Sequence, residues 1–227
     1  MLVAGQMSTE RATRVFLVDD HPLVREWLTN LITRQPDLVV CGEAESTASA
    51  LRTIASAEAD VAIVDLSLDG RSGLELIKEL RQLHPNIGVL VLSMHDEMSF
   101  AERALRAGAR GYVMKREVAK QVVLAIRRVT EGGMWISERV SALLAEKAAA
   151  GVPAGPEPPI DRLSERELEV FRLLGQGQAT RQIAGALHVS AKTVQTYYAR
   201  VKLKFGLASS TQLLREAIRW HEEQGSR

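Results

Sequence analysis

Acidic residues follow two apolar runs in the first part of the chain. Asp19 and Asp20 come directly after "RVFLV", and Asp65 comes directly after "VAIV". Clustered carboxylates raise one another's pKa values unless a cation lies between them. Mg²⁺ suits such a cluster because it accepts one or two carboxylates, keeps its waters and leaves a place for phosphate oxygen. We therefore predict that Asp19 and Asp20 hold Mg²⁺ and that Asp65 attacks a phosphoryl group.

Two further polar residues follow later apolar runs. Ser93 ends "VLVLS", and Lys115 ends "GYVMK". A hydroxyl and an ammonium group are suited to binding the oxygens of a phosphoryl group on Asp65. Taken singly, an acid at a strand end often caps a helix, Ser93 could be another cap, and Lys115 could be a solvated charge. Taken together, the residues predict one phosphoryl-accepting site.

Such a site needs a scaffold that brings several strand ends to one edge. Short runs rich in Val, Ile and Leu alternate with amphipathic stretches of helix length, which indicates parallel strands buried on both faces. The runs are Arg14 to Val18, Leu38 to Cys41, Val61 to Val64, Gly88 to Leu92 and Gly111 to Met114. We predict an α/β domain with a doubly wound, five-stranded parallel sheet, whose ligands lie beyond the carboxyl ends of the strands.

Length and charge distribution indicate two domains. The 227 residues exceed one typical domain, and 46% of them are hydrophobic, which is enough for two cores. Residues 161–227 carry eleven Lys and Arg against seven Asp and Glu, a net charge of +4, while the rest of the chain carries about −3. We predict an N-terminal tail at 1–12, a first domain at 13–132, a helical connector with a Pro/Gly-rich linker at 133–160, and a second domain at 161–227.

The sequence shows no sign of a membrane or a secreted setting. We find no apolar segment that could span a bilayer and no signal-peptide pattern. The single cysteine, Cys41, cannot form an internal disulfide bond. We predict a cytoplasmic protein without a membrane partner.

The second domain has the sequence signals of four short helices. Ser164 with Glu167, and Ser209 with Gln212, have the spacing of capping boxes. Glycines and "HVS" separate the helical stretches, and Gly206 ends the third of them. Four short helices with tight turns predict a small all-α domain of the helix-turn-helix kind.

The third helix of this domain has one apolar and one polar face. At about 100° per residue, Val194, Tyr198 and Val201 fall on one stripe, opposite small polar residues. Residues 175–215 contain no acid. A solvated basic helix would have the same charge, but this pattern also suits the major groove of DNA. We expect Gln195, Thr196 and Ala199 to reach base edges and Lys192, Arg200 and Lys202 to bind mostly phosphates.

The spacing of the acids, Ser93 and Lys115, together with "AGARGYVMK", resembles the flavodoxin-like receiver domain of two-component response regulators. This resemblance covers roughly the first 130 residues. It implies that a sensor histidine kinase phosphorylates Asp65, that the backbone carbonyl of Ser67 joins the Mg²⁺ ligands, and that Tyr112 turns inward on activation. The chain departs from the family at Leu68 and Asp69, where Met-Pro is usual.

The segments "LSERELEV", "QIA" and "SAKTV" resemble the LuxR-type helix-turn-helix domain, which makes the whole chain similar to the NarL/FixJ class. The resemblance implies that the third helix reads double-stranded promoter DNA. It also implies that the fourth helix joins two protomers into a homodimer when the protein is active. The predicted dimer stripe has i, i+3, i+4, i+7 spacing and consists of Leu214, Ala217, Ile218 and His221.

Three other classes of protein share parts of this pattern. A nucleotide-dependent dehydrogenase needs a glycine-rich turn where this chain has "VDDHPL". An aspartyl-phosphate hydrolase of the haloacid dehalogenase type needs a second Asp where Ser67 stands. A DNA-binding regulator whose receiver responds to protein contacts instead of phosphorylation stays open. We expect a phosphorylation-controlled transcriptional regulator and not an enzyme.

Overall fold

The computed structural model describes residues 11–68, 72–94, 97–116, 119–149 and 159–225. The chain divides into two compact units, Met1–Ala150 and Gly151–Arg227, which are described separately. Residues 133–149, named the connector from here on, belong to the first unit. Among the described residues, none of the helices combines the length and the apolar character needed to cross a bilayer.

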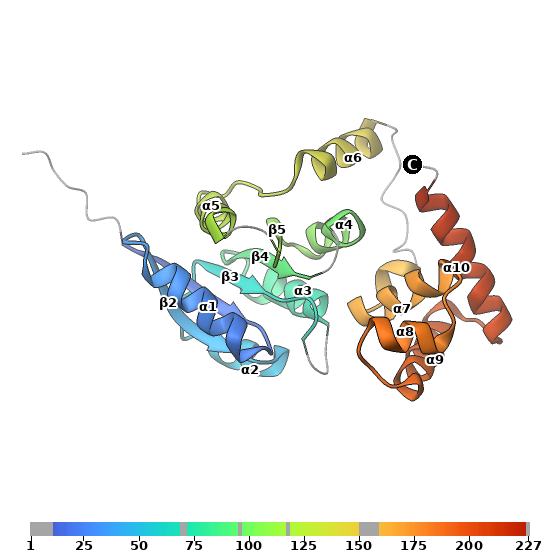
Figure 1. Cartoon of the computed structure of the whole chain (residues 1–227). Coiled ribbons are helices and arrows are strands. Elements are labelled where there is room, and N and C mark those ends of the chain that lie inside the picture. The colour runs from blue at the N-terminus through green and yellow to red at the C-terminus, as the bar shows by residue number, and fades with distance from the viewer. Residues whose placement is uncertain (1–10, 69–71, 95–96, 117–118, 150–158, 226–227) are drawn as a thin grey trace, which may run out of the picture. The chain divides into compact units, whose positions relative to one another are not determined.

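The first unit contains one five-stranded parallel sheet, as predicted, in the order β2-β1-β3-β4-β5 (Figure 1). The strands are β1 (Thr13–Val18), β2 (Leu38–Ala44), β3 (Val61–Val64), β4 (Gly88–Ser93) and β5 (Gly111–Met114). Strand β2 extends beyond the predicted end at Cys41, because its pairing with β1 continues past an irregularity between Val15 and Phe16.

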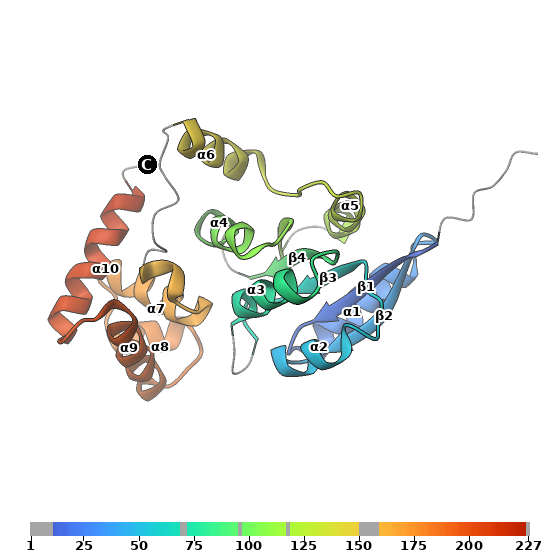
Figure 2. The same ribbon diagram turned by 180° about the vertical axis from the view of Figure 1, so that it is seen from behind.

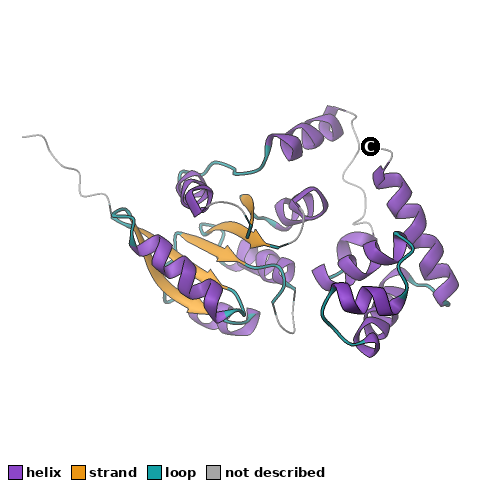
Figure 3. Ribbon diagram, viewed as in Figure 1, coloured by secondary structure: helices purple, strands orange, loops and turns teal. Residues whose placement is uncertain are grey.

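Helices flank the sheet (Figure 3). They are α1 (Pro22–Thr33), α2 (Thr47–Thr53), α3 (Gly73–Leu83), α4 (Glu97–Ala107) and α5 (Ala119–Thr130), whereas α6 (Glu138–Ala149) follows them and packs on α4. Helix α1 contacts α5, while α3 contacts both α2 and α4. Every residue of β3 and β4 is buried, which explains why these strands are continuous apolar runs without alternation. Polar side chains are therefore confined to the strand ends.

The connector packs against the edge strand β5 and against helix α4. Trp135 forms an isolated parallel bridge with Gly111 in β5, and α6 contacts α4. A Cβ atom on Gly111 would lie 3.1 Å from both the Cβ and the carbonyl oxygen of Trp135. Glycine at this position therefore permits the close approach of the connector.

In the second unit, the described residues form a short 3₁₀ turn, η1 (Pro159–Arg162), followed by four helices. Figure 2 shows these helices from behind. They are α7 (Glu165–Gly175), α8 (Thr180–Ala186), α9 (Ala191–Phe205) and α10 (Ser210–Gly225). The predicted capping box at the start of α7 is present, because Ser164 N–H donates to Glu167 Oε2 at 2.8 Å and Glu167 N–H donates to Ser164 Oγ at 3.4 Å. Gly206 ends α9 in the left-handed conformation, with φ 67°.

Candidate functional site

Two buried acids lie side by side where the central strands end. Val18 pairs with Val64 in the parallel β1–β3 ladder, so the residues that follow, Asp19 and Asp65, come to the same level of the sheet. Their exposed fractions are only 2% and 3%. Ligand atoms of Asp19, Asp20, His21 and Asp65 all lie within 4.8 Å of one another. The predicted acidic cluster is therefore formed at one rim.

Lys115 brings a positive charge to this rim from the end of β5. Its Nζ atom lies 2.6 Å from Asp19 Oδ2 and 2.7 Å from Asp65 Oδ2, and only 9% of its side chain is exposed. The backbone N–H of Lys115 donates to the carbonyl oxygen of Ser93 at 2.8 Å, which holds the lysine beside the end of β4. The ammonium group bridges the two carboxylates.

Burial and charge act in opposite directions on these groups. Burial raises the pKa of Asp65, the nearby ammonium of Lys115 lowers it, and the carboxylate of Asp19 raises it further, so the net shift is upward. Burial disfavours the charge on Lys115, but the carboxylates of Asp65 and Asp19 outweigh it and raise the lysine pKa. The ionised form of Asp65, the predicted nucleophile, is thus disfavoured in the folded protein, and a further cation beside it would stabilise this form.

The donor atoms at this rim fit a hard divalent cation. Oδ1 of Asp20 is buried and has no hydrogen-bond partner within the described part of the chain, although it lies 2.6 Å from Nδ1 of His21. A carboxylate oxygen that accepts no hydrogen bond and lies beside two other carboxylates is a ready ligand for Mg²⁺. His21, which was not among the predicted site residues, donates its backbone N–H to Asp19 Oδ1 at 2.9 Å. Its position next to Asp20 is the signal that could have indicated it.

The remaining predicted residues of this site lie around the acids. Ser67 N–H donates to Asp65 Oδ1 at 3.2 Å, so the turn after β3 folds back on the carboxylate. Ser93 is fully buried, and Tyr112 is 2% exposed with its side chain in the core. Leu68 is buried as well, whereas Asp69 lies outside the described residues. The roles assigned to Ser67, Ser93 and Tyr112 stay predictions.

Helix α9 of the second unit has the two faces that its sequence predicts. Val194 and Val201 are fully buried. Ser190 caps the helix, since its Oγ accepts the N–H of Thr193 at 3.0 Å. The opposite face is open to solvent, except that Lys202 is half-buried; its exposed members are Lys192, Gln195, Thr196, Ala199 and Arg200. These side chains can reach a ligand outside the unit.

Comparisons with known proteins identify both units. Residues 15–127 match the response regulator receiver domain, and residues 161–217 match the luxR family of bacterial regulatory proteins. The response regulator GacA of Pseudomonas viridiflava is 35% identical over 206 residues, which are 91% of this chain and 95% of GacA. The chain belongs to the DNA-binding response regulators. This family consists of transcriptional regulators, not of enzymes.

Solved structures of RcsB resemble this response regulator over most of its length. RcsB from Salmonella enterica serovar Typhimurium, bound to promoter rprA with the phosphomimetic BeF₃⁻, is 27% identical with a TM-score of 0.55. The match covers 90% of this chain and 98% of that one. Another structure, which contains two RcsB dimers bound to two parallel DNAs, is also 27% identical with a TM-score of 0.55, covering 90% and 97% of the two chains.

One basic residue of α9 in this response regulator, Lys204, makes contacts within the second unit that were not predicted from the sequence. Nζ of Lys204 donates to Oε2 of Glu167 at 2.6 Å and to the carbonyl oxygen of Arg162 at 2.8 Å. Glu167 is also the capping residue of α7 and is 3% exposed. Lys204 therefore joins the end of α9 to the start of α7.

The predicted dimer stripe on α10 is only partly open to a second protomer. Leu214 and Ile218 are each 37% exposed, and His221 is half-buried. Ala217, in contrast, is fully buried, and a Cβ atom on Gly175 would lie 2.4 Å from its carbonyl oxygen. The side of α10 that carries Ala217 packs on α7 within the monomer. In this structure Ala217 is therefore not accessible to a second protomer, and the dimer stripe stays a prediction.

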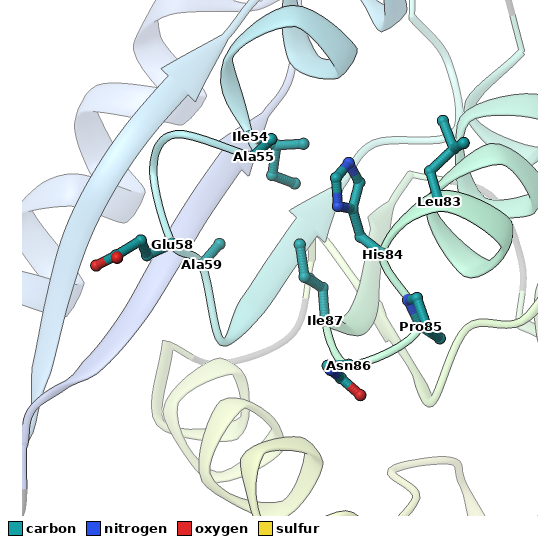
Figure 4. Close-up of a pocket in the computed structure, with 9 residues that line it drawn as sticks. All are labelled: Ile54, Ala55, Glu58, Ala59, Leu83, His84, Pro85, Asn86 and Ile87. Carbon is teal, nitrogen blue, oxygen red and sulfur yellow. The ribbon is translucent and has the colours of Figure 1, made fainter.

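A pocket of about 260 Å³ lies elsewhere in the first unit (Figure 4). Its lining includes Ala59, which comes shortly before β3, and Ile87, which comes directly before β4. The acidic cluster follows the carboxyl ends of the strands, so the pocket lies at the opposite end of the sheet. It takes no part in the candidate site.

Proposed function

We propose that a sensor histidine kinase transfers a phosphoryl group to Asp65 and that this transfer changes the binding of the second unit to promoter DNA. The observation that carries the proposal is the ammonium group of Lys115 between the buried carboxylates of Asp65 and Asp19. In this arrangement the carboxylate of Asp65, the proposed nucleophile, lies beside the ammonium group of Lys115. That ammonium group can move toward the negative charge of a phosphoryl group once it is attached to Asp65. Because promoter DNA is the target, the proposed place of action is the cytoplasm.

Asp19 and Asp20 would hold Mg²⁺ together with Asp65 and the backbone carbonyl of Ser67. When bound, the ion neutralises negative charge on the phosphoryl oxygens, which is the main requirement of a loose phosphoryl-transfer transition state. The residues around Asp65 hold its carboxylate in position. The N–H of Ser67 holds Asp65 Oδ1, and Lys115 holds Oδ2. The acceptor is thereby fixed before the donor arrives.

Phosphorylation would change the partners of Lys115 and Ser93. A phosphoryl group on Asp65 adds negative charge and strong hydrogen-bond acceptors. The ammonium group of Lys115 would turn from Asp19 toward these oxygens, and the hydroxyl of Ser93 would approach them from β4. Tyr112, already buried in this structure, would occupy the space beside Ser93. This rearrangement is the proposed switch.

The DNA-binding unit would act as a dimer that places α9 in the major groove. The support is the exposed polar face of α9 and the RcsB structures that contain dimers bound to DNA. Leu214, Ile218 and His221 would contact the second protomer. A two-fold dimer would bind an inverted repeat with half-sites about one helical turn apart.

The phosphoryl step is tested by incubating the full chain with acetyl phosphate and Mg²⁺ and measuring its intact mass. Wild type should gain one phosphoryl group, and Asp65→Asn should gain none. Asp37→Asn is a matched control because Asp37 is an exposed acid that pairs with Arg127 and comes directly before β2, at the opposite end of the sheet from the acidic cluster. A persistent mass gain on Asp65→Asn would show that Asp65 is not the acceptor. A regulator with a phosphorylation-independent receiver would show no gain in any variant.

A further inference from the structure

The connector is attached to β5 through backbone hydrogen bonds. Trp135 N–H donates to the carbonyl oxygen of Arg110 at 2.9 Å, and Tyr112 N–H donates to the carbonyl oxygen of Trp135 at 2.8 Å. The residue whose side chain is the proposed switch thus holds the connector through its backbone. A Cβ atom on Gly111, between the two partners, would crowd Trp135 at 3.1 Å.

A second attachment joins the connector to α4. Oε1 of Glu97 accepts the N–H of Ser137 at 2.9 Å, immediately before α6 begins. Ser137 Oγ accepts the N–H of Val140 at 3.3 Å, so the two side chains cap the first turn of α6 together. The N-terminal N–H groups and the helix dipole favour a negative charge at this place. The start of α6 is therefore fixed by a residue of α4.

Glu97 is suited to transmitting a displacement because it is buried. It is 7% exposed, and a carboxylate removed from water is stable only where charged or hydrogen-bonded partners replace the water. Glu97 lies four positions after Ser93 in the sequence, at the start of the helix that follows β4. A shift of Ser93 toward a phosphoryl group on Asp65 would act on this end of α4.

The stretch of chain between the two attachments is short. Only Ile136 separates Trp135 from Ser137, and an extended chain spans at most about 3.6 Å per residue, or about 7 Å between these two positions. A relative displacement of α4 and β5 therefore either breaks one attachment or carries the connector with it. A break at Glu97 would leave a buried carboxylate without this N–H donor, which favours movement of the connector.

We propose that Glu97 is a positioning residue that couples the phosphoryl site to the connector. The inference rests on the proposed phosphorylation of Asp65. When Ser93 and the start of α4 move, Glu97 carries the first turn of α6, and the connector passes the displacement along the chain toward the DNA-binding unit. Without the Glu97 acceptor, Asp65 still accepts phosphate, but DNA binding no longer responds to it.

The test compares the full-length Glu97→Leu variant, which has no acceptor, with Glu97→Gln, which retains an oxygen that can accept the Ser137 N–H. Glu102→Leu is the matched control, because Glu102 is a carboxylate on the same helix that pairs with Arg106 at 2.6 Å. Intact mass reports phosphorylation, hydrogen exchange reports the Ser137 amide, and anisotropy titration reports affinity for a promoter duplex with and without acetyl phosphate and Mg²⁺.

Glu97→Leu should be phosphorylated like wild type, exchange its Ser137 amide at least about tenfold faster, and lose the phosphorylation-dependent change in DNA affinity. Glu97→Gln and Glu102→Leu should retain that change. If Glu97→Leu does not fold, Glu97→Ala takes its place with the same expectation. A full DNA response in the folded Leu or Ala variant, or an equal loss in Glu102→Leu, overturns the inference. Wild type without a mass gain overturns the proposed function and this inference with it, so the two failures are distinguishable.

Discussion

Replacing Lys115 with methionine should destabilise the first unit strongly. The substitution keeps an unbranched side chain and removes the ammonium group from between Asp19 and Asp65, whose side chains are 3% exposed. Removing one partner of a buried ion pair costs about 3 to 5 kcal/mol, because the remaining charge is left uncompensated. The upward-shifted pKa of Asp65 limits this cost, since the carboxyl group can take up a proton. We expect a loss of about 3 kcal/mol near neutral pH.

The loss should depend on pH with a definite sign. A carboxyl group whose pKa is raised in the folded state lowers stability when it is ionised, so its penalty exists above the folded pKa and disappears as the pH falls below the unfolded value. Without Lys115, the pKa of Asp65 rises further. The difference between wild type and Lys115→Met should therefore shrink as the pH falls from neutral toward the ordinary pKa of an aspartate carboxyl group. Mg²⁺ at a hundred times its dissociation constant should stabilise Lys115→Met by about 2.7 kcal/mol.

Urea unfolding of the full chain, followed by circular dichroism, measures these differences, and the transition of the second unit serves as an internal reference. The double variant Lys115→Met/Asp65→Asn should recover stability, because only one buried carboxylate, that of Asp19, is then left without the ammonium group. Lys120→Met, on the exposed side of α5, is the control for loss of a lysine charge. Equal urea midpoints for wild type and Lys115→Met, or a larger loss in the double variant, would refute the reasoning.

The remaining predictions concern the second unit. Tyr198→Phe removes a buried hydroxyl that has no partner in the described chain, so thermal unfolding should show unchanged stability or a gain of about 1 kcal/mol; a clear loss would contradict this. Gly175→Ala would place a Cβ atom 2.4 Å from the carbonyl oxygen of Ala217, so it should separate α7 from α10 and cost more than about 2 kcal/mol, and a wild-type melting temperature would disprove it. Gln195→Ala should relax preference at one base position at a cost of about 1 to 3 kcal/mol, whereas Lys202→Ala should weaken all sequences alike and reduce the salt slope by about 1. Titrations on specific and scrambled duplexes separate these two effects.

The sequence was most informative where a pattern depends on neighbouring residues. The runs at Val61–Val64 and Gly111–Met114 coincide with β3 and β5, because strands covered on both faces must be continuously apolar and must end where polar residues begin. Helix α6 (Glu138–Ala149) lies within the helical connector that the sequence predicts in residues 133–160. Its packing on α4 depends on the contact of Glu97 with Ser137, forty positions apart, which no local pattern contains.

Long-range contacts account for what the sequence did not show. The spacing of the α10 stripe places Ala217 on an apolar face, but it does not tell which part of that face the monomer itself covers. Lys204 resembles the other basic residues of α9, and only the folded unit brings it to Glu167. In the same way, the ammonium bridge of Lys115 to both acids depends on the strand order β1-β3-β4-β5.

The most direct test of the central claim is a titration of promoter DNA at increasing fractions of phosphorylated protein. The fraction is set with acetyl phosphate and Mg²⁺ and read from the intact mass, and affinity is read from the anisotropy of a labelled duplex in the same sample. The account predicts that affinity changes progressively as the phosphorylated fraction rises and that Asp65→Asn stays at the unphosphorylated value throughout. An affinity that does not change while wild type becomes fully phosphorylated would contradict it.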